Sequence, residues 1–162
     1  MALIKLNNQS LSAVTSAGLP IRAGSVLQVQ QAAFTGSNVD TTSTSYVATS
    51  LTDTITPSSS SSKVMVTLAG GHLSYYAAGT IIVKVVRTIG GTSTDVSSAT
   101  QWTQKNNAGD NYGESISGNY LDSPSTTNAV TYTVHIKSSN GTRQIITNSV
   151  NLFTITLTEI AG

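Results

Sequence analysis

The chain has 162 residues, which is enough for one domain with its own hydrophobic core. Apolar residues make up 38%, as in globular proteins, but only 9% are charged, and 24 serines and 25 threonines take their place. The net charge of +1 comes from scattered side chains and argues against nucleic-acid binding, while the absence of cysteine excludes disulfides and thiolate metal sites. Because a weakly charged surface gives little repulsion between molecules, this composition favours a permanent assembly.

The first 24 residues are expected to form an extended N-terminal docking arm. They contain no apolar run of the signal-peptide type, and nowhere in the chain do about eighteen apolar residues follow one another, so no membrane span is expected. Large apolar side chains recur without a regular period, at Leu3, Ile4, Leu6, Leu11, Val14, Leu19 and Ile21. They favour an arm that becomes ordered on a partner's surface. The alternatives are a frayed tail and an arm that covers one end of its own domain.

Residues 25–162 carry the alternation of apolar and polar residues that is typical of β-strands. The first strand, near residues 27–34, changes parity before Phe34, which predicts a bulge. Residues 81–89 are apolar on both faces, as in a strand that is covered on both sides. Clean alternation is found at residues 64–68, 130–137 and 153–157, and shorter candidates lie near residues 46–47, 52–55, 116–121 and 143–146. No segment keeps a helical period, so an antiparallel sandwich or barrel is expected.

The turns of this domain are predicted from glycine, asparagine, proline and serine. Pro57 ends one strand, Ser58–Ser62 form a tight polar connection, and the next strand starts at Lys63. A flexible linker between two domains is the alternative for the serine run, but too little chain precedes it to form a separate core. Glycine pairs at Gly70-Gly71 and Gly90-Gly91 also predict turns, and Asn140-Gly141 gives the strongest β-hairpin signal.

Two charged residues share the parity of core residues in their strands. Glu159 follows Phe153, Ile155 and Leu157, and Arg87 follows a similar apolar series. A buried carboxylate needs a cationic or hydrogen-bonding partner, so we expect Glu159 to pair with Arg87, or else with Arg22, at the sandwich end or a subunit contact. The alternative is that Glu159 lies in solvent. The candidate subunit contact comprises Ile82, Val86, Arg87 and Glu159.

No catalytic, cofactor or metal site is expected from the remaining polar residues. The two histidines are not at metal-ligand spacing, and the seven carboxylates form no close pair in the sequence. Aromatic residues fall largely in the expected loops, at Tyr75, Tyr76, Trp102, Tyr112 and Tyr120. They either cap the core or form an exposed recognition surface, for example for sugars.

Several segments together resemble small virion proteins of tailed bacteriophages, especially those of cyanobacterial and other marine phages. The resemblance is carried by "IKLNNQSLSAVTS", "AGSVLQVQQ", "TTSTSYVATSLTDTITPSSSSSKVMV" and the closing "FTITLTEIAG", and it is weakest at residues 90–128. It implies a short arm followed by one β-domain of the jelly-roll or tumour-necrosis-factor-like type. It also implies a non-enzymatic, usually trimeric protein on the phage particle, made in the host cytoplasm.

Such domains serve as capsid cement or decoration proteins, as head fibres and as tail-fibre tips. The chain has no collagen-like or coiled-coil shaft repeat, which a long fibre would need. We therefore expect a capsid cement or decoration homotrimer whose arm docks on the major capsid protein or another virion protein. The alternative is a fibre tip or head fibre that binds a host surface glycan, and no nucleic acid, membrane or cofactor is expected as a partner.

Overall fold

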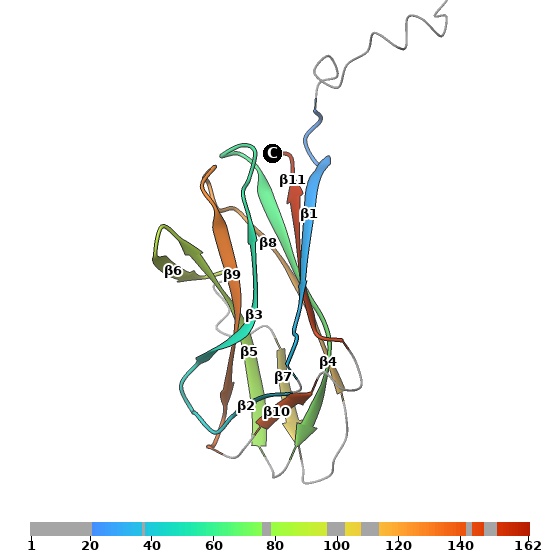
Figure 1. Cartoon of the computed structure of the whole chain (residues 1–162), viewed down its shortest axis with the longest axis vertical. Helices are drawn as coiled ribbons and strands as arrows, with labels where there is room; N and C mark the ends of the chain where they lie inside the picture. The colour runs from blue at the N-terminus through green and yellow to red at the C-terminus, as the bar shows by residue number, and fades with distance from the viewer. Residues whose placement is uncertain are drawn as a thin grey trace, which may run out of the picture.

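The structure is a computed structural model, and it describes residues 21–36, 38–75, 79–96, 103–107, 114–141, 144–147 and 152–162. These residues form β-strands and turns (Figure 1). The strands are β1 (Val26–Ala33), β2 (Asn38–Thr41), β3 (Val47–Ile55), β4 (Lys63–Tyr75), β5 (Gly79–Ile89), β6 (Thr92–Asp95), β7 (Thr103–Asn107), β8 (Glu114–Asp122), β9 (Val130–Ser138), β10 (Gln144–Thr147) and β11 (Thr154–Ile160). Among the described residues there is no helix of a length and apolarity that would cross a membrane.

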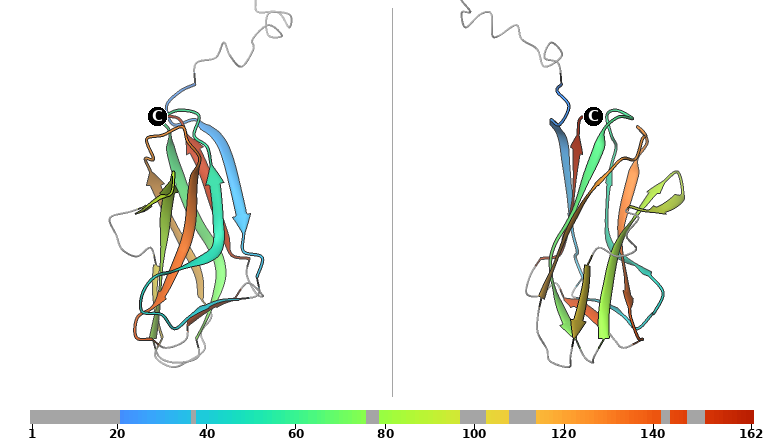
Figure 2. Two further views of the ribbon diagram at one scale, coloured as in Figure 1. Left: turned by 60° about the vertical axis from the view of Figure 1, so that its left-hand side comes forward. Right: turned by 180° about the vertical axis from the view of Figure 1, so that it is seen from behind.

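The strands form two antiparallel sheets that pack face to face, which confirms the predicted β-sandwich (Figures 1 and 2). Sheet 1 has the order β1-β11-β4-β10-β2, with β8 on the other side of β4. Sheet 2 has the order β3-β9-β5-β6, with β7 also paired to β5. The pairings are nested along the chain, because β1 pairs with β11, β2 with β10, β3 with β9, β4 with β8 and β5 with β7.

The core lies between the sheets and is built from the alternating residues that the sequence predicts. Along β9 every second residue is buried, from Val130 to Ser138, and β11 follows the same pattern from Ile155 to Glu159. The side chains at the centre include Tyr132 and Phe153, neither of which has solvent-accessible surface. Alternation predicts these residues correctly because successive side chains of a strand point to opposite faces of the sheet.

The predicted turn at Gly70-Gly71 is wrong, because β4 continues through both glycines. They have positive φ values of 86° and 65°, and the pairing of β4 with β8 shifts register between Gly70 and His72. A Cβ atom on Gly70 would lie 1.7 Å from the Leu152 carbonyl oxygen, so glycine is needed here for its backbone conformation and for the close approach of another strand's end. The glycines therefore mark a bulge inside a long strand.

The serine run is confirmed as a tight connection, and it links the two sheets instead of closing a hairpin. β3 belongs to sheet 2 and β4 to sheet 1. Within the turn the Ser62 amide donates to the Ser59 carbonyl at 3.1 Å, and the Ser61 amide donates to the Ser59 hydroxyl at 3.2 Å. The Ser59 carbonyl and hydroxyl thus satisfy two amide groups of the turn itself, and the hydroxyl contact is expected for this residue type.

The hairpin predicted at Asn140-Gly141 is wrong, whereas the turn predicted at Gly90-Gly91 is confirmed and closes a hairpin. β9 and β10 lie in different sheets, so the chain crosses from one sheet to the other after Asn140. At Gly90 and Gly91 both φ values are positive, at 55° and 84°, and Ile89 pairs with Thr92. This is the conformation of a two-residue type I′ hairpin loop, which only glycine-like residues adopt readily.

The bulge of β1 is at the opposite end of the strand from the predicted one. The register with β11 shifts between Val26 and Gln28 and is then regular to Ala33. Phe34 continues this register, since its amide donates to the Phe153 carbonyl at 2.8 Å, and its side chain is buried. Gln28 therefore shares the inward parity of Phe34, and the apolar Val29 faces outward with 55% of its surface exposed.

Candidate functional site: the arm root and the two outer faces

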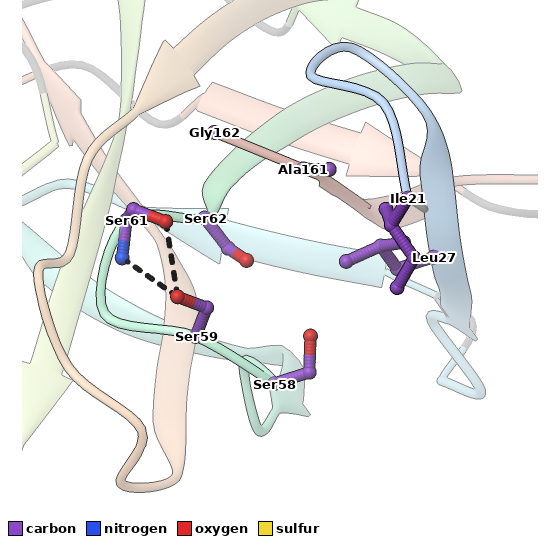
Figure 3. Close-up of a pocket in the computed structure, with 8 residues that line it drawn as sticks. All are labelled: Ile21, Leu27, Ser58, Ser59, Ser61, Ser62, Ala161 and Gly162. Carbon is purple, nitrogen blue, oxygen red and sulfur yellow. Dashed lines mark hydrogen bonds between the residues drawn. The ribbon is translucent and has the colours of Figure 1, made fainter. Parts of the chain in front are cut away.

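The root of the N-terminal arm lies at one end of the sandwich, beside the serine turn and the C-terminus (Figure 1). A pocket of about 320 Å³ opens between these three segments, and Figure 3 shows the side chains around it. Its apolar wall is formed by Ile21 and Leu27, and Ile21 is 68% exposed. Its other wall comprises Ser58, Ser59, Ser61, Ser62, Ala161 and Gly162. Leu3, Ile4, Leu6, Leu11, Val14 and Leu19 of the expected docking arm lie outside the described residues.

Glu159 lies beneath this end of the sandwich and has no solvent-accessible surface, as its parity predicts. Its Oε1 accepts hydrogen bonds of 2.7 Å from both the amide and the hydroxyl of Ser58, and its Oε2 accepts one of 2.6 Å from Gln28 Nε2. Burial alone would raise the pKa of Glu159, but the hydrogen bonds from Gln28 and Ser58 outweigh it and lower the pKa below its ordinary value. The carboxylate thus ties β11, β1 and the serine turn together.

The expected pairing of Glu159 with Arg87 is wrong, because the two residues have different partners. Arg87 Nη1 contacts both carboxylate oxygens of Asp122, at 2.8 and 2.9 Å, and the Tyr132 hydroxyl donates to Asp122 Oδ2 at 2.8 Å. Arg87 faces inward, as its parity predicts, and the pair joins β5 of sheet 2 to β8 of sheet 1. Burial and the neighbouring Asp122 carboxylate raise the pKa of Tyr132 far above its ordinary range.

Sequence reasoning missed the partners of both buried charges. Asp122 is the last residue of its strand and precedes Ser-Pro, so its sequence context is typical of a turn. Gln28 lies in a strand whose bulge was expected nearer to Phe34, so its inward orientation was not predicted. The useful signal was the parity of Glu159 and Arg87. Inward parity indicates that a charged side chain is buried and needs a partner, but it does not identify the partner. In the described part of the chain, no group of three or more histidine, cysteine or acidic residues could hold a metal ion.

The outer face of sheet 1, across β1, β11, β4 and β8, carries hydroxyl, amide and apolar side chains. One register row joins Val29, Thr158, Met65 and Leu121. The adjacent row joins Gln31, Thr156, Thr67 and Asn119, and the Gln31 amide donates to the Thr156 hydroxyl at 2.8 Å. The next row joins Ala33, Thr154, Ala69 and Ser117, so none of these three rows contains a charged residue. An uncharged region of this kind suits contact with another protein surface.

The outer face of sheet 2 differs because it gathers charge around an aromatic ring. The ammonium groups of Lys84 and Lys137 lie 4.3 and 4.7 Å from the centre of the Tyr46 ring, and Lys84 Nζ is 2.6 Å from Asp95 Oδ1. His135 is the register neighbour of Lys84, and burial together with the Lys84 charge lowers the pKa of His135. This cluster, Tyr46, Lys84, Lys137, His135 and Asp95, is called the Tyr46 cluster below.

The expected subunit-contact residues Ile82 and Val86 lie on this same outer face of sheet 2. Ile82 is half-buried, and Val86 is only 7% exposed within the single chain. Little of the Val86 surface is therefore left for a second subunit, and a contact through Ile82 stays a prediction.

Two of the five expected recognition aromatics, Tyr75 and Tyr120, lie within the described residues. Tyr76, Trp102 and Tyr112 lie outside the described residues. Tyr75 is the last residue of β4, and Tyr120 lies in β8 opposite Val66, so both belong to strands and not to loops. Nine residues of β4 separate the positions of Tyr75 and Val66, which is roughly 30 Å of extended chain. The two tyrosines therefore cannot form one small site, and a recognition role for the others stays a prediction.

Comparison with known proteins gives only a distant structural similarity. No protein-family model matches the sequence, and no curated protein is similar to it. Among solved structures, the chain is similar to one in the structure of the infectious bursal disease virus Gx strain, with a TM-score of 0.42 and 8% sequence identity. The match covers 83% of this chain and 30% of that chain, so the protein spans less than a third of the length of that neighbour. A similarity this distant assigns neither a family nor a role, and both are argued from the chain's own residues.

Proposed function

We propose that this protein is a non-enzymatic structural component of a tailed-phage particle, a cement or decoration protein that forms homotrimers and docks on the capsid through its N-terminal arm. The observation that carries the proposal is the uncharged region on the outer face of sheet 1, which comprises the three register rows described above and is bordered by Lys63 toward the root of the arm. Val29 is exposed on this face, at 55%, and Ile21 is exposed at the arm root at the end of the sandwich, at 68%. Together the face and the arm provide a continuous, weakly charged surface for a lattice of other protein subunits.

The strand order supports the finer interpretation of the fold as a jelly roll. Pairing of the first strand with the last, and of each inner pair in turn, is what results when one long hairpin rolls up into two facing sheets. A jelly-roll domain with a short leading arm has the organisation of the phage virion proteins that the sequence resembles.

Deletion of Met1–Gly18 tests the docking role. The described sandwich starts at β1, and its core contains no residue before Phe34, so the truncated protein should fold and keep the oligomer size of the full chain. It should no longer bind phage capsids from which the native protein has been removed, as measured by cosedimentation. As a matched control, the full chain with Thr94→Ala, a small change on the exposed strand β6 of sheet 2, should bind normally. A truncated oligomer that still decorates capsids would contradict the proposal.

The second candidate function is a fibre tip that binds an anionic host glycan, and the Tyr46 cluster favours it. An aromatic ring flanked by two ammonium groups offers stacking to a sugar ring and charge to a carboxylate or sulfate. Glycan-array binding that is lost in Tyr46→Ala would support this role. The copy number of the protein in purified particles separates the two candidates. The number of copies of a cement protein matches the number of sites on the capsid lattice, whereas the number of copies of a fibre tip matches the number of tail fibres.

A further inference from the structure

One edge of sheet 1 is left without a partner strand. β1 pairs with β11 along one side, and no other described strand pairs with β1. Five of its eight residues are exposed, and its sequence, VLQVQQAA, contains neither a charged residue nor proline. After the bulge near Val26, the run from Gln28 to Ala33 keeps an unbroken register with β11. A long, regular, uncharged edge of this kind is a template for another strand.

The direction of the backbone groups on this edge follows from the pairing. Phe34 donates its amide to Phe153, its partner in the register, so the even-numbered residues of β1 direct their N–H and C=O groups toward β11. The odd-numbered residues Val29, Gln31 and Ala33 therefore direct theirs away from the sheet. This edge can thus accept and donate hydrogen bonds to an added antiparallel strand.

The other edge strands carry features that disfavour the addition of a strand. β3 contains Asp53 and a register irregularity between Ala48 and Thr52. β8 begins at Glu114 and ends at Asp122, and its partner strand bulges at Gly70. The remaining edge strands are short and charged, namely β2 with Asp40, β6 with Asp95 and β7 with Lys105. Short length, inserted charge and irregular register are the devices by which proteins protect their edges. Of the described edges, β1 alone lacks a charge.

We propose that β1 pairs with β1 of a second copy, antiparallel and about a twofold axis near Gln30. Self-pairing places each residue opposite a residue of the same strand, and β1 has no charge that would meet its own copy. With Gln30 on the axis, Val29 lies opposite Gln31 of the other copy, which matches the outward-directed backbone groups of both residues. The contact covers Val29 and brings the Val26 side chains, now 61% exposed, beside the other subunit. It also makes the three uncharged rows on the outer face of sheet 1 continuous across two molecules.

This contact does not depend on the proposed virion role. In a trimer that leaves β1 at its periphery, the twofold contact would join one trimer to the next. The readout below is made on the isolated full-length chain, so failure of the contact and failure of capsid docking are distinguishable.

Cysteine crosslinking tests the proposal directly, because the native chain has no cysteine. Gln30→Cys places a single thiol on the proposed axis, directly opposite its own copy, and Ser117→Cys places one on the exposed β8 edge of the same sheet. Under mild oxidation, Gln30→Cys should give a disulfide-linked dimer on a non-reducing gel, whereas Ser117→Cys should stay monomeric on that gel. Absence of a crosslink in Gln30→Cys, or equal crosslinking in Ser117→Cys, overturns the proposal.

A charge substitution provides the second measurement. Val29→Lys places an ammonium group on the exposed side of β1 without touching the core, and Asn119→Lys places one on β8 of the same outer face. By light scattering on a sizing column, Val29→Lys should remove the twofold-related species, and Asn119→Lys should retain it. If the size of the Val29→Lys protein equals that of the native chain, the β1 contact is excluded.

Discussion

Replacing Glu159 by glutamine changes one atom and one charge at a position where the structure leaves no suitable place for an amide. Oε1 accepts two hydrogen bonds from Ser58, so the glutamine oxygen has to take this place and its NH2 group has to face Gln28. Gln28 Nε2 is also a donor, and two donors then meet at the site of the former 2.6 Å hydrogen bond.

Rotation of the Gln28 amide does not resolve this conflict. Gln28 Nε2 also donates to the Thr56 carbonyl at 2.7 Å, so a rotated amide would place its oxygen against the Thr56 oxygen. Glu159→Gln therefore loses at least one hydrogen bond to a charged group, which is about 2 kcal/mol of the free energy of unfolding. For a domain of this size that corresponds to a decrease in melting temperature of roughly 4–8 °C.

The pH dependence of this effect has a defined sign. Hydrogen bonds hold the pKa of the folded Glu159 below the ordinary value of 4.5, so the unfolded chain binds the proton more readily than the native chain. The contribution of Glu159 to stability is present above about pH 4.5 and is lost as the pH falls through the lower, folded pKa. The difference in melting temperature between the native chain and Glu159→Gln should therefore shrink toward acid pH.

Thermal denaturation followed by circular dichroism at neutral and acid pH measures both effects. Thr158→Ala is the matched control, because the neighbouring residue of β11 points to the outer face and should change the melting temperature little. Equal melting of Glu159→Gln and the native chain at pH 7 would refute the assignment of Glu159 as a hydrogen-bonded carboxylate that links β1, β11 and the serine turn.

Other variants probe the remaining structural claims. Arg87→Leu leaves the Asp122 carboxylate buried without its cation, so guanidinium denaturation should show a loss of about 3–5 kcal/mol. Tyr132→Phe should cost only about 1 kcal/mol, since one hydrogen bond is lost from an intact pair. The raised pKa of Tyr132 keeps its hydroxyl protonated in the folded chain, so its contribution to stability should be lost above about pH 10, where the unfolded tyrosine ionises. Gly70→Ala should prevent normal folding, because its Cβ would overlap the Leu152 carbonyl and its φ is positive; a soluble, native-like Gly70→Ala protein would contradict the bulge geometry.

The strands and their inward faces could be predicted because they depend on short-range alternation. β9 and β11 are buried at the residues that their patterns indicate, and the inward parity of Glu159 and Arg87 is also correct. The serine turn follows from local chemistry, since the Ser59 hydroxyl accepts a hydrogen bond from the Ser61 amide within the turn. Each of these features is decided by residues that are close together in the chain.

Sequence alone determined that this is an all-β chain with little charge, a core of alternating apolar residues and two inward-facing charges. Only the tertiary structure decided which residues are the partners of those charged groups, because Asp122 lies 35 residues from Arg87 and Ser58 lies 101 residues from Glu159. It also decided that the chain crosses between sheets after Asn140 and passes straight through Gly70, since a turn-forming sequence does not specify which sheet the next strand joins. Pairing partners of strands are set by the packing of the whole sandwich, and that packing leaves the uncharged edge of β1 open.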